Sequence, residues 1–329
     1  MIVSRTPLRI TLGGGGTDLP SYYEKFGGFI FSFCLSKYMY ICINRPSADN
    51  LVRLKYSKSE TVKSVGELNH ELARACLERV GVDSQIEIAS LSDIPAGSGL
   101  GSSSTYTVGL LNALYSMKGE YKSLESLANE ACIIEMDILK KPMGKQDQYL
   151  AALGGFVVME IDKKGVVTSR KINLEKSILN ELNRNLLIFY TGQQRKNNKI
   201  LKEQDISTKK DKKEVLNSLH YIKDSGYKIL EIVQSGNIDD LGIMFKEHWE
   251  MKKKLSSGVT NSKIDSIYNI ALKNGAIGGK ISGAGGGGFF TFYCNKDHSK
   301  LRKAMFDQGL KELDYSFDFD GSKIIANHR

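Results

Sequence analysis

The residues best suited to chemistry form a glycine-rich stretch at residues 95–105, Pro-Ala-Gly-Ser-Gly-Leu-Gly-Ser-Ser-Ser-Thr. Glycines let backbone N–H groups converge and let a phosphate approach closely. The alternating residues 85–91 before it predict a strand, and Val108, Leu111 and Tyr115 after it recur at helical spacing. The start of a helix adds unpaired N–H groups and the positive end of the helix dipole. The stretch is therefore either a phosphate-binding loop or a flexible loop followed by a helix cap.

Two common phosphate motifs are missing from the sequence. It contains no G-x-x-x-x-G-K-[ST], and no G-x-G-x-x-G lies between a strand and a helix. The stretch Pro-x-x-x-Gly-Leu-Gly-Ser-Ser instead resembles the ATP loop of the GHMP kinases, the family of galactokinase, homoserine kinase, mevalonate kinase and phosphomevalonate kinase. The resemblance implies that ATP is bound by Pro95, Gly97, Ser98, Gly99, Leu100, Gly101, Ser102 and Ser103.

A second motif lies near the N-terminus, where Pro7-Leu8-Arg9 is followed by four glycines and Thr17-Asp18. It resembles the N-terminal motif of the GHMP sugar kinases. This resemblance implies that Arg9 lies beside the reacting hydroxyl and that Asp18 binds sugar hydroxyls. Gly15, Gly16 and Thr17 would line the same substrate site. The alternatives are that Arg9 is a surface charge and that Asp18 caps a helix over residues 19–26.

A third glycine stretch, at residues 278–288, precedes a predicted strand over 289–293. It resembles the third GHMP motif, Gly-x-x-Gly-Ala-Gly-x-Gly-Gly, which implies that Gly283, Gly285 and Gly286 lie under the nucleotide phosphates and the substrate. A turn without function would be poor for stability, because each ordered glycine costs backbone entropy. The three motifs occur in the family's order, so the resemblance covers nearly the whole chain.

Two acidic residues lie between the second and third glycine stretches. Apolar residues recur at helical spacing from Leu124 to Ile134 and Ile138, which predicts a helix over residues 123–139 with Glu135 at the border of its apolar face. Asp147 follows Pro142 and precedes a short helix over 148–153, which it could also cap. The resemblance implies that Ser103 and Glu135 hold Mg²⁺. It also implies that Asp147 accepts or orients the hydroxyl proton, while Arg9 keeps Asp147 ionised.

The remaining sequence predicts alternating strands and helices. Strands are expected over residues 2–12, 29–43 (one or two strands), 51–56, 156–161 and 186–190, with a last strand and turn over 316–325. Helices are expected over 67–80, 213–234, 238–255 and 262–274. Trp249 is expected in the core. The resemblance implies an α+β fold of two domains. Residues 1–183 would form an ATP-binding domain like ribosomal S5 domain 2, and residues 184–329 a ferredoxin-like domain, with the active site between them.

Composition limits the remaining functions. The 329 residues include five scattered cysteines and no long apolar stretch, so we expect a cytoplasmic protein with reduced thiols, no signal peptide and no membrane span. Much of the net charge of +9 lies in residues 195–213, which lack aromatic residues. This pattern favours a solvated basic face over a nucleic-acid surface. A basic protein also suits anionic phosphate substrates. The sequence indicates no oligomeric state.

The substrate is suggested by residues 14–23, Gly-Gly-Gly-Thr-Asp-Leu-Pro-Ser-Tyr-Tyr, and residues 144–149, Gly-Lys-Gln-Asp-Gln-Tyr. Both resemble kinases of the anomeric hydroxyl of heptose 7-phosphate or fucose, and the heptose kinases most. The implied reaction converts D-glycero-D-manno-heptose 7-phosphate to the 1,7-bisphosphate, a precursor of bacterial surface polysaccharide. The alternatives are a fucose-type kinase, a non-catalytic sugar and nucleotide sensor, and a nucleic-acid-binding protein.

A phosphate on the sugar would need its own basic site, away from the ATP loop, to offset its desolvation. Arg195 is the first candidate, because it follows the strand predicted over 186–190. Lys145 and Lys280, each beside one of the motifs, are the second candidates. The alternative is that Arg195 belongs to the solvated basic face.

Overall fold

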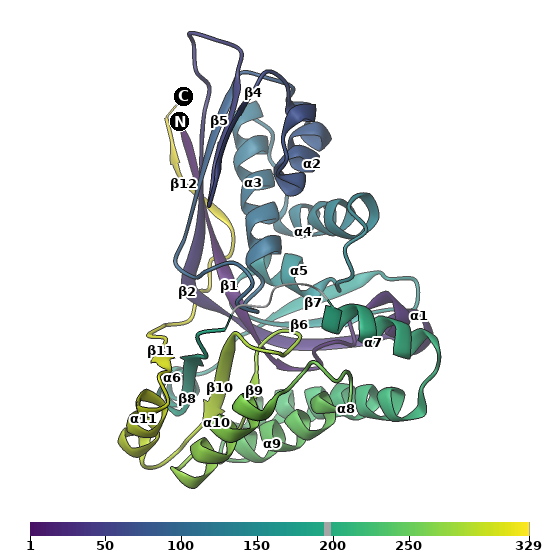
Figure 1. The fold of residues 1–329 in the computed structure, drawn as a ribbon, viewed down its shortest axis with the longest axis vertical. Helices are drawn as coiled ribbons and strands as arrows, with labels where there is room; N and C mark the ends of the chain where they lie inside the picture. Colours follow the sequence, from purple (N-terminus) through teal and green to yellow (C-terminus); the bar gives the residue numbers. More distant parts are fainter. Residues whose placement is uncertain (194–198, 329) are drawn as a thin grey trace.

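The computed structural model describes residues 1–193 and 199–328, so Arg195 lies outside the described residues. Two β-sheets with flanking helices make up the fold, and the α+β prediction is confirmed (Figure 1). The larger sheet has the strand order β12-β1-β2-β5-β3-β4, and β6 pairs with β2 and β7. Its strands are β1 (Ile2–Gly13), β2 (Gly28–Asn44), β3 (Val52–Lys55), β4 (Ser59–Val62), β5 (Ile86–Ser92), β6 (Phe156–Ile161), β7 (Val167–Ile172) and β12 (Lys323–Asn327).

The apolar stretch after residue 28 forms the single long strand β2 of 17 residues. Its first half pairs with β6 and its second half with β5, while β1 runs antiparallel along both halves. On β1, Leu8, Ile10 and Leu12 are fully buried in the core. Since side chains alternate along a strand, Arg9 and Thr11 project from the opposite face. This face of β1 lines the site described below.

Helices cover one face of the upper part of the larger sheet (Figure 1). These elements are the 3₁₀ turn η1 (Val65–Glu67), α2 (Glu71–Val80), α3 (Ser102–Lys118), α4 (Leu124–Cys132) and α5 (Gln146–Leu153). The short helix α1 (Pro20–Phe26) lies apart from them, beside α7 (Lys199–Lys209). The predicted order strand, glycine loop, helix is present as β5, residues 93–101 and α3. Gly101 lies directly before α3 with a φ of 86°, a left-handed conformation that favours glycine. The N-terminus of α3 therefore begins at the end of the glycine stretch.

The helix predicted over residues 123–139 differs from the structure in its second half. Ser123 caps α4 as expected, but residues 133–138 form a π-helical turn, η2 (Ile133–Ile138). A π turn holds an extra residue and shifts the helical faces by one position. Ile138, expected on the apolar face, is 49% exposed, and Glu135 is fully buried. The prediction for Ile138 was therefore wrong, because it assumed one unbroken α-helical period.

The second sheet is antiparallel, with the order β11-β8-β10-β9, and lies in the lower half of Figure 1. Its strands are β8 (Leu186–Tyr190), β9 (Gly278–Ile281), β10 (Phe289–Tyr293) and β11 (Lys311–Glu312). The accompanying helices are α6 (Lys176–Asn185), α7 (Lys199–Lys209), α8 (Lys213–Ser235), α9 (Asp240–Lys253), α10 (Ser262–Lys273) and α11 (His298–Asp307). Trp249 of α9 is fully buried in the apolar core of this part, as expected.

The two sheets share buried contacts. One apolar cluster contains Leu8 and Phe31 of the larger sheet together with Ile229, Phe245 and Phe289 of the C-terminal elements. The chain then returns, so that β12 pairs with β1; this strand begins later than the predicted final strand at 316. The boundary predicted between residues 183 and 184 falls in the last turn of α6, and the division there stays a prediction. Among the described helices, none is long and apolar enough to cross a bilayer.

Candidate active site

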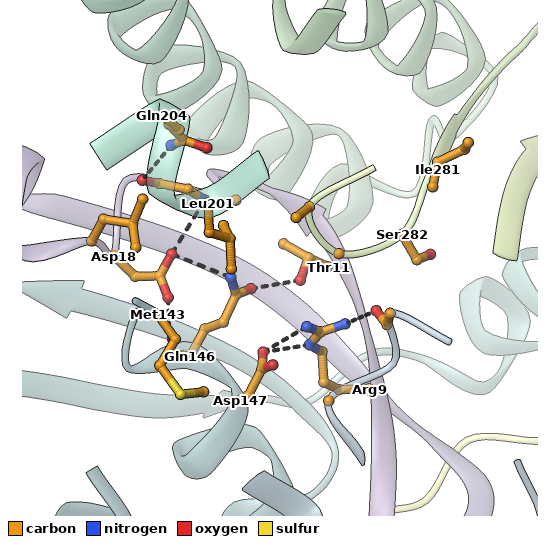
Figure 2. Close-up of a pocket in the computed structure, with 18 of the residues that line it drawn as sticks. Arg9, Thr11, Asp18, Met143, Gln146, Asp147, Leu201, Gln204, Ile281 and Ser282 are labelled. Carbon is orange, nitrogen blue, oxygen red and sulfur yellow. Dashed lines mark hydrogen bonds and ion pairs between the residues drawn. The ribbon is translucent and has the colours of Figure 1, made fainter. Parts of the chain in front are cut away.

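A cavity of about 450 Å³ opens where the three glycine stretches meet (Figure 2). Its wall combines the end of β1 and the loop that follows it, the loops that precede α3 and α5, helices α7 and α9, and the end of β9 with the segment after it. The lining residues are Arg9, Thr11, Gly15, Gly16, Asp18, Leu19, Gly97, Gly99, Gly101, Ser102, Ser103, Lys141, Met143, Gly144, Gln146, Asp147, Leu201, Gln204, His248, Lys252, Leu255, Lys280, Ile281, Ser282, Gly283 and Ala284.

Arg9 and Asp147 form an ion pair inside this cavity (Figure 2). The Nε and Nη2 atoms of Arg9 lie 2.7 and 2.6 Å from Oδ1 of Asp147. Its Nη1 donates to the Gly99 carbonyl at 2.7 Å, which ties the pair to the glycine loop. A Cβ on Gly101 would lie 3.5 Å from both side chains, so the loop passes directly over the pair. Arg9 is buried, and the surface-charge alternative was therefore wrong.

Asp18 lies on another part of the cavity wall, in a set of hydrogen bonds centred on Gln146 (Figure 2). Its carboxylate accepts from the backbone N–H of Gln146 at 3.1 Å, from Gln146 Nε2 at 3.2 Å and from the Gly16 N–H at 3.2 Å. The Thr11 hydroxyl donates to Gln146 Oε1 at 2.7 Å. The cap of α1 is Leu19, without a side-chain hydrogen bond, so the alternative that Asp18 caps this helix was wrong.

Gly144 explains how the Asp18 carboxylate reaches the loop before α5. A Cβ at Gly144 would lie 2.0 Å from Asp18 Oδ2, which no real side chain could do. The glycine in the sequence Met143-Gly144-Lys145 is therefore required by the close approach of Asp18 rather than by its own dihedral angles.

Burial raises the pKa of Asp18 to about 6, although hydrogen bonds from Gln146 and Gly16 lower it. In the folded protein the group therefore holds its proton at a pH where the unfolded chain has lost it. Unfolding then releases a proton, and the free energy of unfolding falls as pH rises from about 4 to 6. The expected fall is on the order of 2–3 kcal/mol.

Urea unfolding at intervals between pH 4 and 7 measures this slope. The Asp18→Asn variant has no titrating group at this position, so its free energy of unfolding should fall by less over the same range. Equal slopes in the two proteins would contradict the assignment of the raised pKa to Asp18.

Ser103 and Glu135 come together at the N-terminal end of α3. The Ser103 hydroxyl donates to Glu135 Oε1 at 2.9 Å, and Gln148 Nε2 donates to Glu135 Oε2 at 2.8 Å. Burial raises the pKa of Glu135, against the lowering effects of serine hydrogen bonds and the charge of Lys141. Oxygen donors of this kind suit Mg²⁺, which takes few protein ligands and keeps several waters. The buried carboxylate and the hydroxyl beside it therefore fit a magnesium ion.

The predicted ATP loop contributes Gly97, Gly99, Gly101, Ser102 and Ser103 to the cavity wall. The other predicted members differ in exposure: Pro95 is exposed, whereas Ser98 and Leu100 are buried. The third glycine stretch packs onto this loop, because a Cβ on Gly288 would lie 2.0 Å from the Ser98 carbonyl oxygen. Gly288 has a φ of 94°, so only glycine suits the position.

The predicted substrate residues divide into two groups. Gly15, Gly16, Asp18 and Gly283 line the cavity. Thr17 is fully buried, and its hydroxyl donates to the carbonyls of Gly14 and Phe29, so it fixes the loop. Gly285 and Gly286 approach residues 258–259: Cβ atoms there would lie 2.8 and 2.9 Å from the Val259 and Gly258 carbonyl oxygens.

Several lining residues were missed by the sequence reasoning. Gln146 adjoins Asp147 in the motif at residues 144–149, so its position in the sequence could have indicated that it lines the site. Gln204 of α7 donates to the Gly16 carbonyl at 3.3 Å, and His248 lies on α9. These two residues have no local pattern, because only tertiary packing brings α7 and α9 to the cavity.

Comparisons with known proteins identify the family of the chain. The GHMP kinases N terminal domain model matches residues 66–155, and the GHMP kinases C terminal model matches residues 229–311. The chain is 30% identical to D-glycero-alpha-D-manno-heptose 7-phosphate kinase from Campylobacter jejuni, over 98% of both proteins. It is 26% identical to L-fucokinase/L-fucose-1-P guanylyltransferase from Bacteroides fragilis, over 92% of this chain and 35% of that protein.

A similar fold occurs in the crystal structure of a D-glycero-D-manno-heptose 1-phosphate kinase from Bacteroides thetaiotaomicron. It has a TM-score of 0.84 and 24% identity, with all of both chains covered. The full-length match at 30% identity and the two family models both relate the chain to the GHMP kinases. The chain therefore belongs to the GHMP kinase family, and it is an ATP-dependent kinase.

Proposed function

We propose that this kinase phosphorylates the anomeric C1 hydroxyl of D-glycero-D-manno-heptose 7-phosphate and forms the 1,7-bisphosphate, a precursor of bacterial surface polysaccharide. The observation that carries the proposal is the Arg9–Asp147 ion pair directly under the glycine loop, in the cavity that also contains Asp18. The full-length relative from Campylobacter jejuni supports the choice of a heptose 7-phosphate. In this proposal the enzyme acts in the cytoplasm.

The reaction joins the substrate oxygen to the γ-phosphorus of ATP and breaks the bond from that phosphorus to the β,γ-bridging oxygen. Asp147 accepts the hydroxyl proton or orients it for transfer. Arg9 holds Asp147 in position, and its guanidinium offsets negative charge that develops during transfer. The backbone N–H groups of Gly97, Gly99, Gly101 and Ser102 contact the phosphates, at the positive end of α3.

Ser103 and Glu135 would hold the Mg²⁺ that accompanies ATP. When bound, this ion neutralises phosphate charge. Asp18, fixed by Gln146 and Gly16, accepts hydrogen bonds from sugar hydroxyls on another part of the cavity wall. The cavity is thus organised with the metal and phosphates near α3 and the sugar along β1.

The test is ADP release in the presence of Mg²⁺ with four sugars: heptose 7-phosphate, the same heptose without phosphate, L-fucose and galactose. We expect the highest kcat/KM with heptose 7-phosphate, and a phosphorus nucleus coupled to the anomeric proton in the NMR spectrum of the product. A preference for L-fucose would instead favour the fucokinase alternative, which the Bacteroides fragilis relative supports. Sugar binding without ADP release would indicate a sensor.

A further inference from the structure

Three basic side chains lie together on the cavity wall formed by the C-terminal elements. We call His248, Lys252 and Lys280 the basic floor. Lys280 on β9 is 3% exposed, and its Nζ donates to the carbonyl of Leu12, the second-last residue of β1. Its Nζ also lies 4.7 Å from the centre of the Phe245 ring.

The charge of Lys280 is not balanced by a protein carboxylate. Among residues 1–193 and 199–328, no Asp or Glu oxygen lies within 4.0 Å of its Nζ. A buried ammonium is costly unless it is paired. Burial and the charge of Lys252 lower the pKa of Lys280, and burial, Lys280 and Lys252 lower that of His248. An anion at the basic floor would oppose all of these effects.

The other two members hold the floor in place. Lys252 Nζ donates to the carbonyls of Ile281 and Gly283, and so braces the segment that follows β9. His248 Nδ1 lies 3.5 Å from the Ser225 hydroxyl of α8. Lys280 therefore contacts β1 through the Leu12 carbonyl and α9 through the Phe245 ring.

Strand β1 sets the separation between the basic floor and the reacting end of the cavity. Arg9 contacts Asp147, and the Leu12 carbonyl contacts Lys280. Three residues of strand span roughly 10 Å at about 3.3 Å a residue. A heptose 7-phosphate has its reacting hydroxyl at C1 and its phosphate at C7, at opposite ends of the molecule. A sugar lying along β1 can therefore place C1 at Asp147 and the phosphate at Lys280.

The other lysines near the site, Lys141 and Lys145, are less suitable for binding the substrate phosphate. Lys141 acts on Glu135, at the end of the cavity assigned to the metal. Lys145 Nζ donates to the Gly165 carbonyl at 2.5 Å and lies over the Tyr23 ring. Unlike these two lysines, Lys280 is both buried and part of the cavity wall.

We propose that Lys280, flanked by His248 and Lys252, binds the phosphate group that the sugar substrate carries at the end remote from the reacting hydroxyl. The inference rests on the proposed function for the identity of the sugar. It assigns the recognition of the substrate phosphate to β9 and α9 of the C-terminal elements, while Asp18 and Asp147 recognise the hydroxyls.

Kinetics of Lys280→Met on heptose 7-phosphate and on the same heptose without phosphate test the proposal. We expect kcat/KM for the phosphorylated sugar to fall by roughly 10- to 100-fold, the loss of a hydrogen bond to a charged group. The KM for ATP and kcat/KM for the unphosphorylated sugar should stay within about twofold. Lys145→Met is the matched control and should leave the preference between the two sugars unchanged. Lys280→Gln keeps an N–H donor for the Leu12 carbonyl. It replaces Lys280→Met in the same kinetic comparison if Lys280→Met does not fold.

A binding experiment separates this inference from the proposed function. Inorganic phosphate is titrated calorimetrically into parent and variant, each saturated with MgADP so that the nucleotide site is filled. We expect binding to the parent and at least about tenfold weaker binding to Lys280→Gln. Equal binding would overturn the inference, even if heptose 7-phosphate is the substrate. In the kinetic test, an equal fall in kcat/KM of Lys280→Met with both sugars, together with a raised KM for ATP, would overturn the inference as well. Lys280 would then contact the transferred phosphoryl group.

Discussion

Replacing Asp147 by asparagine is expected to lower kcat by about 10²-fold or more, because the variant keeps the shape of the side chain and loses the group that accepts the proton. The amide oxygen can still accept a hydrogen bond from Arg9, which lies 2.6–2.7 Å from Oδ1 in the parent. The loop from Gly97 to Ser103 is unchanged by the substitution. The Kd for MgATP, measured by calorimetry, should therefore stay within about twofold.

Asp137→Asn is the matched control, since Asp137 is an exposed carboxylate on η2 and outside the cavity wall. Its kcat should equal that of the parent. If Asp147→Asn folds, binds MgATP and turns over at nearly the parental rate, Asp147 is not the residue that handles the proton. A pH profile adds a second readout, because loss of a base changes the dependence of kcat on pH.

The overall fold was largely predictable because local signals and motif resemblance agreed. Apolar alternation indicated β1 and β6, and the glycine after a strand indicated the start of α3. The Arg9–Asp147 contact joins residues 138 positions apart. No periodicity could predict that contact, and only the resemblance to the GHMP kinases suggested it. The resemblance therefore predicted the contact between distant residues of the site, and the local sequence pattern predicted the strands and helices that carry them.

The parts that could not be predicted depend on tertiary packing or on local exceptions to helical periodicity. Gln204 and His248 line the cavity only because tertiary packing brings α7 and α9 to its wall. Gly144 gave no indication of its role, which depends on the Asp18 carboxylate from a distant loop. The π-helical turn η2 contradicts the simple 3.6-residue period, and it occurs where Glu135 is buried next to Ser103. Such turns occur frequently at functional sites.

The second large effect is expected at this buried carboxylate. Glu135→Gln should raise the Mg²⁺ concentration for half-maximal activity by at least about tenfold, because the amide has lost the charge that favours the ion. The same change should not destabilise the fold. Burial raises the pKa of Glu135, so its ionised form is disfavoured in the folded protein, and a neutral amide removes that cost. The amide can still accept from Gln148 and donate to the Ser103 oxygen.

The experiment pairs Mg²⁺ titrations of activity with urea unfolding at pH 7. Glu125→Gln is the matched control, because Glu125 is exposed on α4, and both of its measurements should equal those of the parent. Ser103→Ala should shift the Mg²⁺ titration in the same direction by a smaller factor, since a neutral hydroxyl is a weaker ligand than a carboxylate. A Glu135→Gln protein with a parental Mg²⁺ titration would show that Glu135 is not a metal ligand. A Glu135→Gln protein that is several kcal/mol less stable would instead mean that the carboxylate is retained for folding, contrary to the effect of burial on its pKa.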